Sequence, residues 1–143
     1  MDTYFDLGGY SFPVTTQSTE AQKWFDRGIL WTYGYNHEEA VMCFERAIGA
    51  DPKCAMAYWG AGYASGPNYN MPWDLFDYAG RAAAARAGYA NARKALDMID
   101  GVTRWEAALI NALPARYPQP EPLDPEVMKA WNADFAYAMR DVF

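Results

Sequence analysis

Residues 24–52 read WFDRGILWTYGYNHEEAVMCFERAIGADP, and this stretch decides the fold. Apolar residues recur at helical spacing on both sides of a short polar turn, which predicts two helices joined as a hairpin. Gly28 and Ala40 are small where the helices would cross, while Trp24 and Phe44 can fill the space beside that crossing. The pattern therefore predicts a tightly packed hairpin that closes at an Asp-Pro pair.

A second unit follows at the same period, because Tyr58 and Gly62 lie 34 residues after Trp24 and Gly28. The period and the residue pattern resemble the tetratricopeptide repeat (TPR) family, with one departure at Arg27, where the repeat has leucine. The resemblance implies an all-α fold, a right-handed stack of about three TPR-like helical hairpins that forms an α-α superhelix. Such repeats bind many unrelated partners, so the resemblance is specific for fold and weak for function.

The chain divides into an arm and a repeat domain. Residues 1–17 are too apolar for a free tail, so we expect them to pack on the first hairpin. Residues 18–143 form the repeat domain, with repeats at about 18–52, 53–100 and 103–143. The second repeat carries an insertion, Gly66–Trp73, which we expect to form an ordered lid whose Tyr69 and Trp73 lie against the first hairpin.

Helix starts can also be predicted. Ser18 and Asn36 are suited to cap the first two helices, and Thr103 forms a capping box with Glu106. A proline-rich loop follows over residues 117–125, and the last helix would begin after it at an Asp-Pro pair.

Composition excludes several classes of function. Eighteen acidic and twelve scattered basic residues give a net charge of -6, which argues against nucleic-acid partners. Apolar stretches are interrupted by charges and the start lacks a signal-peptide pattern, so we expect no membrane span and a cytoplasmic location. The two cysteines, Cys43 and Cys54, are expected to be free thiols. No motif predicts a cofactor, and we assign no catalytic residue and no metal ligand set.

The segment from Tyr4 to Trp73 also resembles the N-terminal part of long bacterial TPR-containing proteins of unsettled function. The shared motifs are Tyr-Phe-Asp-Leu-Gly, Trp-Phe-Asp-Arg-Gly, Asn-His-Glu-Glu-Ala and Gly-Pro-Asn-Tyr-Asn, in that order. With this resemblance, and with no polar capping helix after the last hairpin, we expect further C-terminal repeats.

In TPR proteins the first helices of successive repeats line a concave groove. This resemblance implies an aromatic, nearly uncharged groove that binds a peptide or helix of a protein partner. The groove positions are Phe25, Ile29, Tyr33, Met56, Trp59 and Tyr63. They lack the Lys and Asn side chains with which TPR co-chaperones hold a C-terminal carboxylate. The alternative is that these residues pack under a following repeat or under the insertion.

Two other functions remain open. The first is a small-ligand, metal or enzymatic site, in which a histidine and a thiol could bind a soft metal or activate a nucleophile. Its residues would be His37, Cys54, Asn68, Tyr69 and Asn70, and the alternative is that His37 merely packs against the insertion or forms a hydrogen bond with it. The second is self-assembly into a homo-oligomer through an exposed face of the last helix, formed by Trp131, Phe135, Met139 and Phe143.

Overall fold

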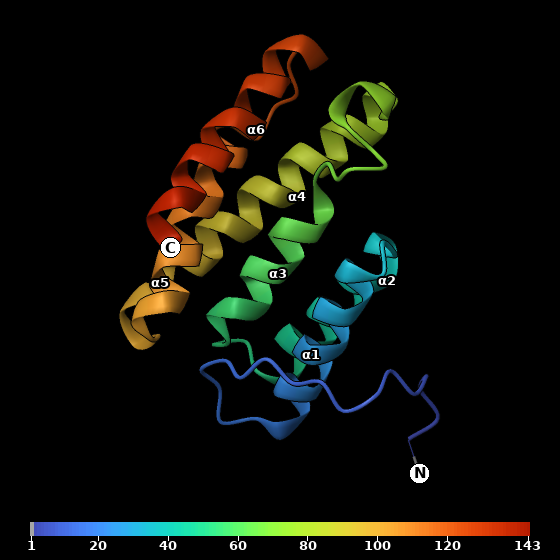
Figure 1. The fold of residues 1–143 in the computed structure, drawn as a ribbon, viewed down its shortest axis with the longest axis vertical. Coiled ribbons are helices and arrows are strands. Elements are labelled where there is room, and N and C mark those ends of the chain that lie inside the picture. Colours follow the sequence, from blue (N-terminus) through green and yellow to red (C-terminus); the bar gives the residue numbers. More distant parts are fainter. Residues whose placement is uncertain (1) are drawn as a thin grey trace.

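The computed structural model describes residues 2–143 and is all-helical, with 68% of the chain in helix and no strand in that range. Six α-helices pack against one another (Figure 1). Their bounds are α1 Thr19–Tyr33, α2 His37–Ala50, α3 Ala55–Ser65, α4 Tyr78–Asp97, α5 Arg104–Ala112 and α6 Pro125–Met139. Short 3-10 helices are η1 Trp73–Leu75, η2 Ile99–Gly101, η3 Leu113–Arg116 and η4 Arg140–Val142. Within residues 2–143, none of these helices has both the length and the apolar character needed to span a bilayer.

The predicted helix starts are confirmed. The Ser18 hydroxyl accepts a hydrogen bond from the Ala21 amide at the start of α1, and the Asn36 side chain caps α2 in the same way. At α5, the Thr103 side chain and the Glu106 side chain each bind the other residue's backbone amide, as a capping box requires. These bonds satisfy backbone donors that the first turn of a helix leaves free.

Phe44 packs between two glycines of different helices. A methyl group added at Gly28 of α1 would lie 2.5 Å from the Phe44 ring, and one added at Gly60 of α3 would lie 2.4 Å from it. Both distances are too short for a real contact, so only glycine allows Phe44 to sit between α1 and α3. The prediction of a small residue at Gly28 is confirmed, and Gly60 is a second such position that the repeat pattern did not indicate.

Tyr117 is the centre of the C-terminal half of the core. Its side chain is fully buried, its hydroxyl donates to the Gly62 carbonyl at 2.7 Å, and its ring lies against Gly88 of α4. The buried Trp73 ring meets Tyr117 and Trp131 edge-on, at centroid distances of 6.4 and 6.2 Å. The expectation that Tyr69 and Trp73 lie against the first hairpin is therefore wrong, since Tyr69 is 90% exposed and Trp73 packs elsewhere. Trp73 anchors the insertion to the C-terminal helices, where a large apolar ring finds a buried site.

The N-terminal arm crosses the first hairpin (Figure 1) and makes contact with α5. At one end, the Tyr4 hydroxyl accepts a hydrogen bond from the Trp31 indole at 2.7 Å. At the other end, the Thr15 amide and hydroxyl donate to the Glu106 carboxylate at 2.7 and 2.6 Å. The arm therefore connects the first hairpin to α5, a contact that lies beyond what the sequence predicted.

Candidate functional site

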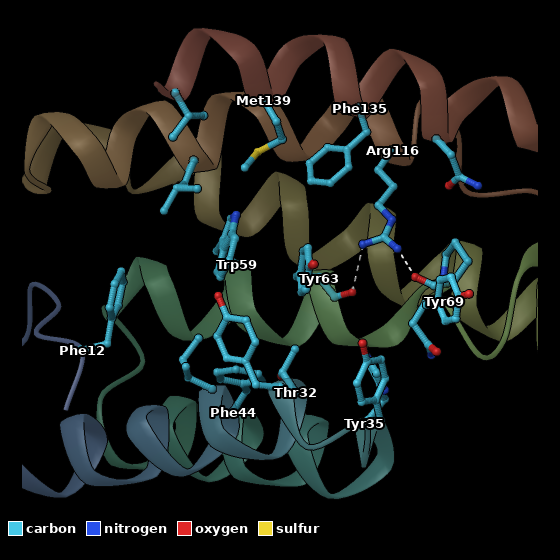
Figure 2. Close-up of a pocket in the computed structure, with 18 of the residues that line it drawn as sticks. Phe12, Thr32, Tyr35, Phe44, Trp59, Tyr63, Tyr69, Arg116, Phe135 and Met139 are labelled. Carbon is cyan, nitrogen blue, oxygen red and sulfur yellow. Dashed lines mark hydrogen bonds between the residues drawn. The ribbon is translucent and has the colours of Figure 1, made fainter. Parts of the chain in front are cut away.

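A pocket of about 840 Å³ lies between the layer of α1 and α3 and the layer of α5 and α6 (Figure 2). Ile29 and Tyr33 come from α1, and Trp59 and Tyr63 come from α3. The rings of Trp59 and Tyr63 stack at 5.3 Å with an interplanar angle of 15°. The opposite wall is built from Trp105 and Leu109 of α5 together with Asn132, Phe135 and Met139 of α6.

The wall carries no acidic side chain in the part of the chain that the structure describes. Its polar groups are tyrosine hydroxyls, Thr32, the amides of Asn68 and Asn132, His37 and Arg116. The arm contributes the remaining side of the wall through Tyr10 and Phe12. An aromatic pocket with a few polar groups that converge on it is the usual form of a binding site.

Arg116 is the fixed positive charge of the pocket. It is only 7% exposed, and its guanidinium donates hydrogen bonds to the carbonyl oxygens of Tyr63, at 3.3 Å, and of Pro67 (Figure 2). The guanidinium carbon lies 5.1 Å from the centre of the Tyr63 ring and 5.3 Å from that of Phe135, within cation-π range. Within residues 2–143 Arg116 makes no ion pair, and its Nε hydrogen has no acceptor.

Trp59 presents a second donor without an acceptor. Its side chain is 8% exposed, and its indole Nε1 is buried and has no hydrogen-bond partner among residues 2–143. The Tyr63 ring contacts both the Trp59 ring and the Arg116 guanidinium. Two buried donors without an acceptor therefore flank one ring of the pocket.

His37 lies in the pocket wall at the first residue of α2. Burial lowers the pKa of its imidazole and the positive charge of Arg116 lowers it further, although a hydrogen bond to the Tyr35 backbone opposes both. Tyr35 has a φ of 60°, which turns the chain between α1 and α2 so that its side chain also lies in the wall. His37 is therefore neutral near pH 7, and among the described residues of the wall Arg116 is the one that carries positive charge.

Four of the six predicted groove residues line the pocket, namely Ile29, Tyr33, Trp59 and Tyr63. Phe25 and Met56 do not line it, because both are buried in the core with 0% and 1% exposure. The Phe25 ring packs against Phe44 at 5.5 Å beneath the pocket. The prediction that Phe25 and Met56 contact a ligand in the groove is therefore corrected, since α1 and α3 turn these positions into the interior.

The predicted polar site is brought together only in part. His37, Asn68 and Tyr69 line the pocket, whereas Asn70 is exposed outside it and Cys54 is buried at the N-cap of α3. The eleven residues of α3 separate Cys54 from the insertion by about 16 Å along the helix axis. Cys54 therefore cannot act with the insertion at one site.

The thiols also lack the setting of a nucleophile or a metal ligand. Both cysteines are buried, and burial raises the pKa of each thiol, which keeps it protonated. Within residues 2–143, no group of three His, Cys, Asp or Glu side chains is arranged to hold a metal ion.

The predicted exposed face on the last helix is not a single surface. Trp131 is 6% exposed, because it packs against the Trp73 ring. Phe135, Met139 and Phe143 line the pocket instead. The self-assembly hypothesis assumed that all four residues are exposed together, and Trp131 is the residue that contradicts this.

Sequence reasoning missed Arg116 and the contribution of the arm to the pocket. One signal was present, because Arg116 is the only charged residue in the stretch Ile110–Tyr117. A lone charge in an apolar stretch suggests a special environment, since unpaired charges are rarely buried. The position of this lone charge in the sequence does not indicate which cavity the Arg116 side chain lines.

Comparisons of this chain with protein-family models, with curated proteins and with solved structures found no match.

Proposed function

We propose that this chain is a TPR-like interaction module that binds a peptide or helix of a protein partner through apolar side chains that enter the pocket. The 34-residue spacing between Trp24 and Tyr58 supports the repeat assignment, as does the direct packing of α1 on α2 and of α3 on α4. A right-handed stack of about three hairpins would place α1 and α3 side by side in the wall of the binding site.

The observation that carries the proposal is the aromatic pocket itself. Its volume of about 840 Å³ is enough for several side chains, and stacked rings such as Trp59 and Tyr63 offer large apolar contact with little loss of rotamer freedom. Tyr33 is 79% exposed in the wall, which is a large apolar surface to leave in water. A partner that covers it would remove this surface from solvent.

A peptide-library selection on the immobilised chain, followed by fluorescence-polarisation titration of the selected peptides, tests the proposal. Two exposed tyrosines provide a matched pair, because Tyr33 lines the pocket and Tyr78, 71% exposed on α4, does not. We expect Tyr33→Ala to weaken binding roughly tenfold, as for an aromatic residue at an interface centre, and Tyr78→Ala to leave it unchanged. Equal effects of the two substitutions would contradict the assignment of the pocket.

The pocket volume also favours a second candidate, a small apolar ligand. Small-molecule sites commonly measure about 300–1,000 Å³, and this pocket falls within that range. Native mass spectrometry of the purified chain would then show a stoichiometric added mass. The mass should be reduced by Tyr33→Ala and retained by Tyr78→Ala.

A further inference from the structure

The buried guanidinium of Arg116 has fewer partners than a buried charge requires. A charge removed from water is stabilised by a counter-ion together with hydrogen bonds that occupy all of its donors. Arg116 has two backbone carbonyls as acceptors, no acidic partner within residues 2–143, and an Nε hydrogen that faces no acceptor. The missing partner is therefore an anion.

The surroundings of Arg116 hold its guanidinium in place at the pocket. The rings of Tyr63 and Phe135, whose centres are 6.3 Å apart, both lie within cation-π range of it, and the carbonyls of Tyr63 and Pro67 fix its orientation (Figure 2). A fixed guanidinium loses little conformational freedom when it binds a carboxylate. Among residues 2–143 no acidic side chain lines the wall and competes for it, although the chain as a whole has a net charge of -6.

We propose that the ligand of this pocket carries a carboxylate that pairs with Arg116, and that this carboxylate is attached to an apolar or aromatic body lying against Trp59 and Phe135. The inference rests on the proposed function, because it concerns the same pocket.

A carboxylate fits the charge of the site better than a phosphate does. A phosphate monoester carries about -1.5 to -2 charges at neutral pH, while the wall, as far as residues 2–143 form it, offers one fixed cation and a neutral His37. A phosphate would therefore leave excess negative charge among aromatic side chains, whereas a carboxylate is neutralised by one guanidinium. An acidic side chain next to an aromatic residue in a partner segment and a free aromatic acid share this chemistry.

Two matched pairs of probes test the inference on the unaltered chain. Naphthoate and its neutral amide, naphthamide, represent the free acid; the capped peptides acetyl-Trp-Glu-Phe-amide and acetyl-Trp-Gln-Phe-amide represent a partner segment. Binding is measured by NMR titration of the tryptophan indole signals at neutral pH. We expect the acid of at least one pair to bind about tenfold or more tightly than its neutral counterpart, as for a hydrogen-bonded charge pair.

Substitutions then locate the effect. Arg116→Gln should remove the preference for the acid, and Arg93→Gln, which changes an arginine outside the pocket, should keep it. Because Arg116 also binds the Tyr63 and Pro67 carbonyls, Arg116→Lys is a second variant that retains the charge. It should retain part of the preference while losing the paired geometry of the guanidinium.

The outcomes separate the two proposals. A preference for naphthoate over naphthamide assigns the site to free acids. A preference confined to the glutamate peptide assigns the site to a partner segment. Each preference supports the inference if Arg116→Gln abolishes that preference. Equal binding of acids and neutral counterparts overturns the inference and leaves an apolar pocket standing. If no probe binds, both the inference and the proposed function are overturned.

Discussion

Replacing Glu106 with glutamine is the sharpest test of how the arm is held. Glu106 is fully buried, and its carboxylate accepts four hydrogen bonds. Oε1 accepts from the Thr15 amide at 2.7 Å. Oε2 accepts from the Thr15 hydroxyl at 2.6 Å, from the Thr103 amide at 2.8 Å and from the Thr103 hydroxyl at 2.7 Å. A glutamine has nearly the same shape, but one of its two terminal atoms is a donor.

Either orientation of this glutamine leaves a backbone amide without an acceptor. If its NH₂ group replaces Oε1, the NH₂ faces the Thr15 amide, and if it replaces Oε2, it faces the Thr103 amide. One unsatisfied buried amide costs about 1–3 kcal/mol, and loss of the charge weakens the remaining bonds. We therefore expect Glu106→Gln to lower the free energy of unfolding by about 2–4 kcal/mol.

The pH dependence gives this prediction a second readout. Burial alone would raise the pKa of Glu106, but the hydrogen bonds from Thr15 and Thr103 outweigh it, so the pKa lies below its ordinary value of 4.5. A lowered pKa in the folded state means that the carboxylate stabilises the fold above about pH 4.5, and that this contribution is lost as the pH falls through the folded pKa. The difference between the two proteins should therefore shrink in acid.

Urea unfolding at neutral and acidic pH, followed by tryptophan fluorescence, measures both effects. Glu45→Gln is the control, because Glu45 is exposed on α2 and its substitution should change stability by less than about 0.5 kcal/mol. A loss below about 1 kcal/mol for Glu106→Gln at neutral pH would refute the reasoning, as would a difference that persists unchanged in acid.

Two further predictions concern the core and the pocket. Gly60→Ala should destabilise the fold by about 1–3 kcal/mol, since its methyl group would overlap the Phe44 ring. Gly49→Ala is the control, because a methyl group at this position of α2 meets nothing within 4 Å and should stabilise the fold by about 0.5–1 kcal/mol. Thermal unfolding distinguishes the two variants, and equal losses of stability would contradict the close packing at Phe44. Burial lowers the pKa of His37 and Arg116 lowers it further, so Arg116→Gln should raise this pKa. NMR titration of the chain's single histidine measures the change. An unchanged pKa would mean that the guanidinium charge does not affect the imidazole.

Local features of the structure could be predicted from the sequence. The first hairpin and the capping residues Ser18, Asn36 and Thr103 lie where the sequence placed them. These features depend on residues within a few positions of one another, such as a side-chain oxygen and an amide three residues later. Interactions of this kind are present in the sequence itself, so reading them needs no knowledge of tertiary packing.

The positions that were wrong are those where a distant segment decides burial. The resemblance to TPR proteins placed Phe25 and Met56 on a groove face, but these side chains are buried in the core, where the Phe25 ring packs against Phe44. Trp73 was expected on the first hairpin, yet its site is formed by Tyr117 and Trp131, more than forty residues further along the chain. A helical period gives the direction of a side chain and does not give the element that covers it.

The pocket and the attachment of the arm depend on one another. Phe12 meets Trp105 edge-on at 5.0 Å, and both rings line the pocket. Thr15, three residues after Phe12, donates two hydrogen bonds to Glu106, which directly follows Trp105. The hydrogen bonds of Glu106 therefore hold in place the segment that supplies Tyr10 and Phe12 to the wall. Within residues 2–143 the Glu106 carboxylate accepts four hydrogen bonds from Thr15 and Thr103 and makes no ion pair with Arg116, so the guanidinium stays available to a ligand.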